Sequence, residues 1–434
     1  MARHLILGGF MATGKSTVGR IAAERTGAAF VDTDERIGPL LEARAAAYAE
    51  CHARLPTDAR SPEEVADAAT AVWRREPIAV AAGARSYVVD VGDALLGERA
   101  AALASSAPVR LLVTDRNVAA LHAAPVERAL SGAHTLARVV LEPGEEHKNI
   151  GAVERIWDAA LAASADRGMV VVALGGGVVS DIAGLAAATF MRGVAWFGLP
   201  TTLLAMVDAS VGGKTAVDRG AAKNAVGAFW QPSGVVCDVS VLATEPERGF
   251  RSALAEVVKT ALVGDASLLD VLEREAARIQ ARDPALVVEL VRRSVAVKAG
   301  IVSRDEREQS GLRAQLNLGH TFGHALEAHG GYRRLPHGEA VSLGLVAALR
   351  LGERLGVTHR AVVERTVRLL DALGLTTDLS AEPLAEAARL VAHDKKRAGT
   401  DVRFVLVQEP GRLVLQRVPL AELVSQAPRL RSPM

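Results

Sequence analysis

Apolar residues between Leu111 and Met191 fall into short, nearly continuous runs, and a segment with helical spacing follows each run. Three of these runs are RLLVTD, RVVLEPG and MVVVAL, and the segments after them include NVAALHAAPVERALSGA, AVERIWDAALAASADRG and GGGVVSDIAGLAAATFM. Strands that are apolar at successive positions are typical of a parallel sheet with helices on both faces. The pattern therefore predicts an α/β fold in the middle of the chain.

The pattern changes on either side of this region. Two short strands are expected in IAVAAGARSYVVDVG, whereas after Val241 strands nearly vanish and helical spacing takes over, as in ALVVELVRRSVAVKAGIV. Near the C-terminus, VRFVLVQEPGRLVLQRV predicts a hairpin that turns at Pro410-Gly411. We expect three parts: a segment over residues 1–75, an α/β domain over 76–245, and a mainly α-helical domain over 246–434.

The first part begins with an apolar strand, a glycine-rich turn and a helix. Gly9, Gly14, Lys15 and Ser16 have the spacing G-x-x-x-x-G-K-S, in which backbone N–H groups and a helix N-terminus surround a phosphate. In the next predicted strand, FVDTD, Asp32 and Asp34 suit Mg²⁺ or a polyol substrate, or belong to an ordinary turn. A further helix is expected to start in SPEE, at Ser61.

Composition narrows the functions that are open to the chain. Its 434 residues carry 51 basic and 50 acidic side chains, so no bulk charge attracts nucleic acid or an anionic membrane. Aromatic residues make up 3%, which counts against base stacking. Two cysteines exclude a disulfide scaffold, and no apolar run is long enough for a membrane span. We expect a cytoplasmic protein with a small-molecule substrate and neither a nucleic-acid nor a membrane partner.

A second glycine-rich turn follows the most apolar strand. Gly175, Gly176 and Gly177 precede a helix that carries Asp181, an arrangement that lets backbone amides approach a pyrophosphate. A tight strand–helix turn is the alternative. Asp115 at the end of RLLVTD could accept hydrogen bonds from hydroxyls, and Pro200-Thr201-Thr202 ends a later strand. These additions favour a dinucleotide site, whereas Gly213-Lys214-Thr215 lacks the upstream glycine of a phosphate loop.

Histidines cluster in the helical part. His320 and His324 are spaced i, i+4 in NLGHTFGHALE, and His337 follows in LPHGEAV. This spacing favours a divalent metal site with an open coordination position, which requires a carboxylate as a further ligand. Glu256 is the best candidate, because it lies in a helical segment with few charges, and Lys259 shares its face.

Basic side chains near these motifs favour a small substrate with several negative charges. Several of them lie in apolar or glycine-rich settings, where a cation without an anionic partner would be costly to bury. They are Arg192, Lys214, Lys223, Lys259, Lys298, Arg313, Lys395 and Lys396.

From about Pro77 onward the chain resembles the 3-dehydroquinate synthase family of sugar phosphate cyclases. The motifs that carry the resemblance occur in the family's order: VTDRNV, EPGEEHK, ALGGGVVSD, LPTTLLAMVDASVGGKTAVD, KNAVGAFWQP, ALAEVVKTALVGD, LRAQLNLGHTFGHALE, HGEAV and HDKK. Ser180 departs from the family, which usually has glycine there, and we expect the serine to be tolerated beside the turn.

This resemblance implies an α/β fold with a Rossmann-like NAD-binding domain and a helical metal-binding domain. It also implies a lyase reaction of the shikimate pathway, which leads to aromatic amino acids. The substrate, 3-deoxy-D-arabino-heptulosonate 7-phosphate, would be oxidised at C5 by NAD, lose phosphate, be reduced again and close into 3-dehydroquinate. The metal would be Zn²⁺ or Co²⁺, and the substrate phosphate could act as the internal base.

Residue roles follow from the same resemblance. The NAD contacts implied are Asp115, Asn117, Glu145, Lys148, Gly176, Gly177, Asp181, Thr201, Thr202, Lys223 and Thr244. The metal ligands implied are Glu256, His320 and His337. Lys259, His324, Asp208 and Asn317 are expected to be catalytic, and Lys214, Asn224, Lys298, Arg313 and Lys395 or Lys396 to bind substrate. Arg192 resembles a phosphate ligand donated by a neighbouring subunit, which implies a homodimer.

The first 75 residues resemble the beginning and end of shikimate kinase without its middle. Ala12 stands where that family commonly has glycine, and so short a segment cannot build the kinase core. We expect a degenerate remnant that no longer phosphorylates shikimate; a nucleotide-sensing or interaction module is the alternative. For the main part, the alternatives are a sister cyclase acting on sedoheptulose 7-phosphate and a metal-dependent NAD polyol dehydrogenase.

Overall fold

The computed structural model describes residues 15–26, 61–104, 107–132, 135–220, 222–391, 397–398 and 401–432. The predictions for Gly9, Gly14, Asp32, Asp34, Lys395 and Lys396 fall outside these residues. Within them, no helix combines the length and apolar character that crossing a lipid bilayer requires.

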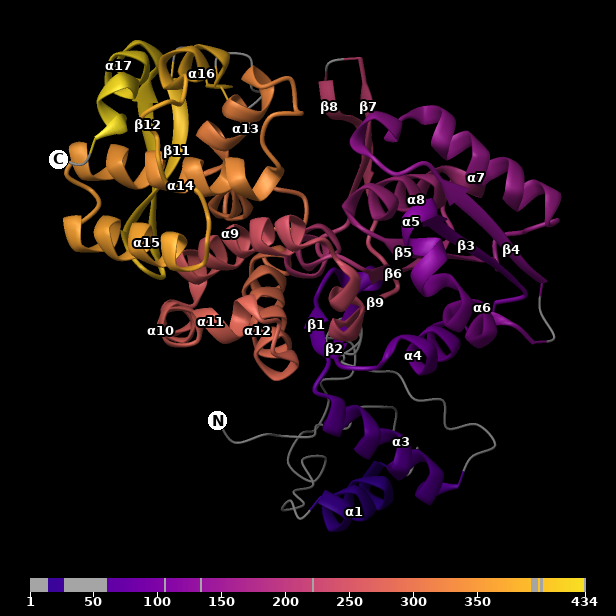
Figure 1. Ribbon diagram of the computed structural model, residues 1–434. Coiled ribbons are helices and arrows are strands. Elements are labelled where there is room, and N and C mark those ends of the chain that lie inside the picture. The colour runs from indigo at the N-terminus through magenta and orange to yellow at the C-terminus, as the bar shows by residue number, and fades with distance from the viewer. Residues whose placement is uncertain are drawn as a thin grey trace.

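A seven-stranded sheet forms the centre of the α/β part (Figure 1). The strand order is β1-β2-β9-β6-β5-β3-β4, and every neighbouring pair is parallel except β1 and β2. The strands are β1 (Ile78–Val80), β2 (Tyr87–Gly92), β3 (Val109–Asp115), β4 (Thr135–Leu141), β5 (Val170–Gly175), β6 (Ala195–Pro200) and β9 (Gly234–Asp238). The predicted parallel sheet and the two short strands around Gly83 are confirmed.

Helices cover both faces of the sheet because both faces are apolar. Val172 and Leu174 of β5 pack into the same apolar cluster as α4 and α6, whereas Val171 and Ala173 pack with α7 and α8 on the opposite face. Both clusters consist of buried side chains, as the near-continuous apolar runs predict. The helices are α4 (Leu96–Leu103), α6 (Ala124–Leu130), α7 (Ile150–Ala162) and α8 (Gly177–Thr189).

The parallel register places several loops at one edge of the sheet. Asp115, the last residue of β3, pairs with Leu141 of β4, and Gly175 of β5 pairs with Pro200 of β6. The segments that follow these strands therefore lie side by side, and Thr201 N–H donates to the Gly175 carbonyl at 3.0 Å. This edge is where open α/β sheets bind ligands.

The remaining part is mainly helical and packs against the sheet-containing part. Its helices are α9 (Glu247–Gly264), α10 (Ala266–Arg274), α11 (Ala276–Gln280), α12 (Pro284–Val302), α13 (His320–His329), α14 (His337–Arg354), α15 (Arg360–Ala372), α16 (Leu384–Leu390) and α17 (Leu420–Gln426). One apolar cluster continues from Leu174 in the sheet to Val257 in α9 and Phe322 in α13, so the two parts share a core. The predicted hairpin is confirmed as β11 (Asp401–Glu409) and β12 (Arg412–Pro419), beside β10 (Arg397–Ala398).

A second hairpin was not predicted. β7 (Lys214–Arg219) and β8 (Ala222–Phe229) form a two-stranded antiparallel sheet that projects beyond α8 in Figure 1. Every position of β8 is exposed or half-buried, and its apolar stretch is interrupted by Gly227, unlike the buried runs of the central strands.

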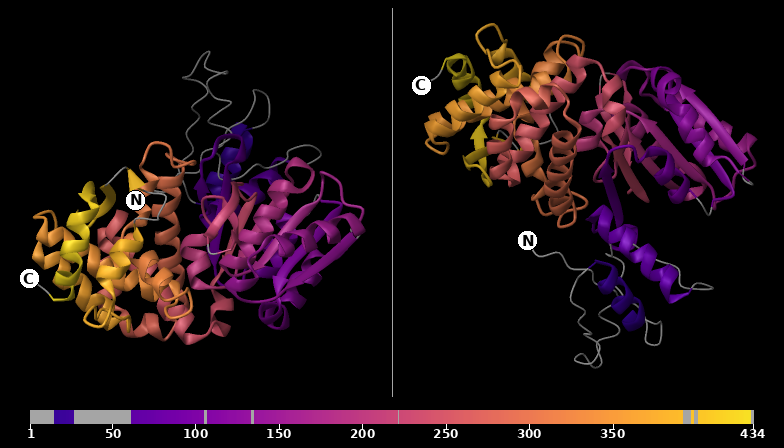
Figure 2. Two further views of the ribbon diagram at one scale, coloured as in Figure 1. Left: turned by 90° about the horizontal axis from the view of Figure 1, so that it is seen from above. Right: turned by 60° about the horizontal axis from the view of Figure 1, so that its bottom comes forward.

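Two helices precede the sheet and pack on each other. α1 (Lys15–Thr26) and α3 (Pro62–Arg75) share a small apolar cluster of Val18, Val65 and Ala66, and they lie apart from the rest of the ribbon in Figure 2. The predicted helix start is confirmed, because Ser61 and Glu64 form a capping box.

Candidate active site

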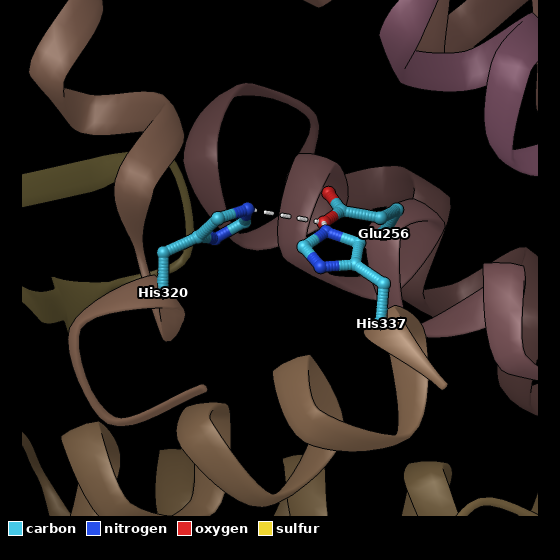
Figure 3. A group of neighbouring side chains, drawn as sticks. All are labelled: Glu256, His320 and His337. Atoms are coloured by element: carbon cyan, nitrogen blue, oxygen red, sulfur yellow. Dashed lines mark ion pairs between the residues drawn. The ribbon is translucent and has the colours of Figure 1, made fainter. Parts of the chain in front are cut away.

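The three predicted metal ligands converge from three different helices (Figure 3). His320 Nε2 and His337 Nε2 each lie 3.3 Å from Glu256 Oε1. Glu256 is completely buried in α9, whereas each histidine is the first residue of its helix, α13 or α14. One carboxylate oxygen and two imidazole nitrogens are donors that zinc-type ions accept.

Close backbone packing brings the histidines together. A side chain at Gly344 in α14 would place its Cβ 2.1 Å from the Gly319 carbonyl oxygen, and Gly319 directly precedes His320. Gly338, next to His337, is equally restricted, because its Cβ would lie 1.9 Å from the Ser252 carbonyl oxygen of α9. The glycines in HGEAVSLGL therefore allow α14 to approach both α9 and the start of α13.

The carboxylate of Glu256 carries a full charge in this buried position. Burial alone would raise its pKa, but Lys259 and His320 hold the pKa well below its ordinary value. Lys259 Nζ lies 2.5 Å from Glu256 Oε2, yet neither carboxylate oxygen accepts a hydrogen bond of good geometry. An acceptor-rich, buried carboxylate beside two imidazoles fits a divalent cation.

Two more side chains lie beside this cluster. His324 is one turn beyond His320 in α13, and the centroids of their rings are 5.0 Å apart. Glu327 and His324 form, with His337, a second group whose possible ligand atoms all lie within 4.8 Å of one another. Spacing in the sequence identified His324 but not Glu327, although Glu327 lies seven residues after His320 and so shares its side of the helix.

Lysines predicted to act on substrate lie next to the metal ligands. Lys298 Nζ of α12 donates to Asp208 Oδ1 at 2.6 Å, and Lys259 Nζ lies 3.8 Å from the same oxygen. Burial lowers the pKa of Lys298 to about 8, although Asp208 opposes the shift. Burial would raise the pKa of Asp208, but the two lysines hold it below its ordinary value.

The predicted substrate-binding cations are paired with acceptors of the chain itself. Arg313 is buried, and its Nη2 donates to the Gly212 carbonyl at 3.0 Å. Lys214, the first residue of β7, donates to Glu308 Oε2 at 2.6 Å. Asn317 ends the short helix Arg313–Asn317, three residues before His320. The sequence did not indicate Glu308 as a site residue, because its partner Lys214 is 94 residues away along the chain.

A second polar cluster joins the glycine-rich turn to the β7–β8 hairpin. Lys148 Nζ lies 2.5 Å from both Asp181 Oδ2 and Asn224 Oδ1. Burial raises the pKa of Asp181 to about 6 although Lys148 opposes the shift. Lys223 Nζ lies 3.4 Å from Glu145 Oε1 and 4.5 Å from the centroid of the Tyr332 ring.

The predicted dinucleotide contacts lie along the carboxyl edge of the sheet. The turn after β5 is glycine-rich partly for packing, because a Cβ at Gly175 would lie 2.6 Å from Val179. Asp115 Oδ1 caps its own helix by accepting N–H groups of Asn117 and Val118. The other predicted contacts at this edge are Gly176 and Gly177 at the start of α8, Thr201 and Thr202 after β6, and Thr244. Thr244 Oγ1 lies 2.8 Å from His122 Nε2.

Two predicted residues stand outside these clusters. Arg192 is exposed on the turn after α8 and has a left-handed φ of 68°. Its position in a single chain does not identify a role for it. Ser180 is buried in α8, and its hydroxyl has no hydrogen-bond partner. The helix therefore contains Ser180 in place of the family's usual glycine, but its Oγ is left without a hydrogen bond.

Family models divide the chain much as its elements do. The model described as 3-dehydroquinate synthase N-terminal matches residues 138–252, and the one described as 3-dehydroquinate synthase C-terminal matches residues 253–397. A shikimate kinase model matches residues 11–52. Most of that last segment lies outside the described residues.

Among known proteins, the chain is 45% identical to the 3-dehydroquinate synthase of Halorhodospira halophila, over 77% of the chain and 93% of the relative. Among solved structures, it is similar to 2-epi-5-epi-valiolone synthase from Streptomyces hygroscopicus subsp. jinggangensis, solved with NAD⁺ and Zn²⁺ bound. That match has 29% identity and a TM-score of 0.72, and it covers 79% of this chain and 96% of the other.

The fold also resembles a crystal structure of 2-deoxy-scyllo-inosose synthase, with 23% identity and a TM-score of 0.73, over 81% of this chain and 99% of that one. The predicted α/β fold with a mainly helical second part is confirmed. With its extensive identity to named relatives and two matching family models, the chain belongs to the 3-dehydroquinate synthase family.

Proposed function

We propose that this chain converts 3-deoxy-D-arabino-heptulosonate 7-phosphate to 3-dehydroquinate and phosphate, with NAD and a divalent metal ion as cofactors. The reaction is that of a carbon–oxygen lyase of the shikimate pathway. Membership of the family supports the proposal. The observation that carries it is the convergence of Glu256, His320 and His337 directly beside the buried ammonium groups of Lys259 and Lys298.

Glu256, His320 and His337 would hold the metal ion, and the carboxyl edge of the sheet, at the glycine-rich turn after β5, would hold NAD. When bound, the ion supplies Lewis acidity at the substrate C5 oxygen and NAD supplies a hydride acceptor. The valiolone synthase structure with NAD⁺ and Zn²⁺ supports this pair of cofactors. Zn²⁺ or Co²⁺ suits the donor set of one carboxylate and two imidazoles.

Lysine and arginine side chains would bind the negative groups of the substrate. Lys298 and Lys259 share Asp208 as a counter-ion, so a substrate carboxylate or alkoxide can be bound without leaving either ammonium unpaired. Arg313, buried beside Gly212, adds a fixed guanidinium. Asn224, close to Lys148 near the turn of the hairpin, suits the phosphate, and Lys214, at the start of β7, suits another negative group of the substrate.

Proton transfer would be divided between substrate and protein. The substrate phosphate, held by lysine side chains and Asn224, serves as the internal base for the proton at C6, so the chain has to position it rather than supply a base. His324, half-buried beside His320, then holds or moves a proton next to the metal-binding cluster.

A sister cyclase activity on sedoheptulose 7-phosphate is the main alternative, because a synthase with a different product, 2-epi-5-epi-valiolone synthase, shares the fold. The cluster of Lys298, Arg313 and Asn317 favours a substrate with a carboxylate, since a sugar without one has less use for two buried cations. Purified protein is to be assayed for phosphate release with both sugar phosphates under identical conditions. We expect turnover of the heptulosonate; preferential turnover of sedoheptulose 7-phosphate would contradict the proposal.

The assembly and organisation of the chain are part of the proposal. A homodimer would allow the exposed Arg192 of one subunit to reach the site of the other. The boundaries proposed remain residues 1–75, 76–245 and 246–434. A reducing, cytoplasmic location suits the buried free thiol of Cys237.

For the first part, we propose a degenerate shikimate kinase remnant. The matching kinase model covers only residues 11–52. Shikimate phosphorylation by the purified protein that is abolished in Lys15→Ala would contradict this proposal. If the segment senses nucleotides instead, ATP would change synthase kinetics or melting, and deletion of residues 1–75 would abolish that change.

A further inference from the structure

Glu327 is a buried carboxylate that no role assigned so far explains. It lies in the last part of α13 and is 5% exposed. Its Oε1 and Oε2 lie 3.3 Å and 3.4 Å from Nδ1 of His337, so both oxygens face the same ring nitrogen. A carboxylate is rarely buried without a partner, and the imidazole provides one here.

The two metal-binding histidines are oriented in the same way. His320 Nδ1 lies 3.2 Å from the carbonyl oxygen of Leu318, and its Nε2 faces Glu256. His337 presents Nδ1 to Glu327 and Nε2 to Glu256. In each ring an acceptor therefore faces Nδ1, and Nε2 points into the ligand cluster.

This orientation matters because a neutral imidazole carries a single N–H. Only the tautomer with the proton on Nδ1 leaves the Nε2 lone pair available to a metal ion. An acceptor at Nδ1 selects that tautomer and fixes the plane of the ring. For His320 the acceptor is the backbone, whereas for His337 it is the replaceable side chain of Glu327.

We propose that Glu327 is a positioning residue for the metal site, which accepts the Nδ1–H of His337 and holds its Nε2 toward the ion. The inference rests on the metal site of the proposed function and adds a residue that touches neither metal nor substrate. It differs from the alternative in which His324, Glu327 and His337 themselves bind the ion.

The surroundings of Glu327 support an acceptor that is fixed in position. Its backbone carbonyl accepts the N–H of Tyr332 at 2.8 Å, and Lys223 lies over the Tyr332 ring. The end of α13 is thus tied to the β7–β8 hairpin.

Metal affinity tests this role without substrate. The full-length protein is stripped with a chelator, and the Zn²⁺ dissociation constant is measured by competition with a chromogenic chelator. We expect Glu327→Ala to weaken Zn²⁺ binding about 10–100-fold, as loss of a partner to a metal-binding histidine typically does. Glu327→Gln, which keeps an acceptor oxygen, is expected to lose less than Glu327→Ala.

Four controls separate positioning from ligation and from misfolding. Glu245→Gln alters another buried carboxylate and should leave Zn²⁺ affinity unchanged. Metal-free Glu327→Gln should keep the circular dichroism spectrum of the metal-free parent. The visible spectrum of the Co²⁺-loaded variant should keep its band positions, because the ligands and their number are the same. His324→Ala should bind Zn²⁺ within about 3-fold of the parent.

Unchanged Zn²⁺ affinity in Glu327→Ala would overturn the inference, and so would a Co²⁺ spectrum that reports a lost ligand. A large loss of affinity in His324→Ala would instead favour the group of His324, Glu327 and His337. Failure of the proposed function looks different: the parent would then bind Zn²⁺ with the predicted dependence on Glu327 but release no phosphate from the heptulosonate.

Discussion

Lys259 Nζ lies 2.5 Å from Glu256 Oε2, one turn away on α9, and both side chains are almost completely buried. Burial would lower the pKa of Lys259, but Glu256 and Asp208 raise it, so the ammonium stays charged. The pair leaves Oε1 of Glu256 facing His320 and His337. One carboxylate thus faces a fixed cation on one side and a possible metal position on the other.

This arrangement predicts that His337→Ala loses the metal while the fold survives. His337 lies at a helix start and is partly exposed, so its truncation removes a ligand without leaving a large cavity. We expect Zn²⁺ affinity and turnover to fall by more than about 100-fold, beyond the effect of an outer partner. Metal content after dialysis and the circular dichroism spectrum check this.

Chelation offers the matching test on the unaltered protein. A chelator should abolish turnover, and added Zn²⁺ or Co²⁺ should restore it. Turnover that survives complete metal removal would show that the assignment of Glu256, His320 and His337 is wrong.

Lys214 and Glu308 predict opposite changes in substrate affinity. Lys214→Ala removes a cation for the anionic substrate and should raise KM about 10–100-fold, the usual effect of a lost charge-assisted hydrogen bond. Glu308→Gln removes the carboxylate that competes for Lys214 and should lower KM. Steady-state kinetics and NAD binding by calorimetry provide the measurements.

Arg219→Ala is the matched control for this pair, because Arg219 is exposed at the other end of β7. We expect it to leave KM unchanged. An equal rise in KM in Arg219→Ala, or weaker NAD binding in Lys214→Ala, would argue against a specific role for Lys214.

The low pKa of Lys298 predicts a pH limit for the free enzyme. Burial lowers this pKa to about 8, so the ammonium loses its proton as the pH rises through that value. Loss of the charge weakens binding of an anionic substrate, and kcat/KM should fall above about pH 8 whereas kcat changes less. In Lys298→Arg, whose guanidinium stays protonated, the fall should move to higher pH; an unchanged profile would contradict the assignment.

Glu245 predicts a dependence of stability on pH. Burial raises its pKa to about 7, above the ordinary value of 4.5. A carboxyl group with a raised pKa stabilises the folded state at low pH and loses that contribution as the pH rises through about 7, by about 3 kcal/mol at most. Glu245→Gln should therefore melt like the parent at pH 5 and at a higher temperature at pH 8.

Glu247→Gln provides the comparison, since Glu247 is exposed on the first turn of α9. Its Tm difference from the parent should be small and the same at both values of pH. If Glu245→Gln behaves in the same way, the buried carboxyl group has no such influence on folding.

The spacing of apolar residues predicted those helices and strands that are buried enough to have a recognisable apolar pattern. β5 and most of α8 are apolar because other helices and strands cover them, so both could be identified without the structure. The β7–β8 hairpin could not, because only three positions of β7 are buried, and the apolar stretch of β8 is exposed or half-buried and interrupted by Gly227. Exposure removes the signal on which strand prediction depends.

Residues of the candidate site could be predicted where their neighbours in the sequence form a recognisable pattern. His320 and His324 share a helical face, and Glu256 is a charge in an apolar helix, so all three stand out. Glu308 and Glu327 do not, because their roles depend on partners that only folding brings near. Contacts between separate elements are set by the tertiary structure and have no fixed spacing along the chain.

Redox balance during turnover tests the central claim most directly. Purified full-length protein with Zn²⁺ and a small amount of NAD is given the heptulosonate phosphate, while released phosphate and absorbance of NADH are followed together. The account predicts many phosphates released per NAD and no net NADH, because the hydride is returned in each cycle. One NADH accumulated per substrate consumed, or turnover that does not depend on NAD, would contradict it.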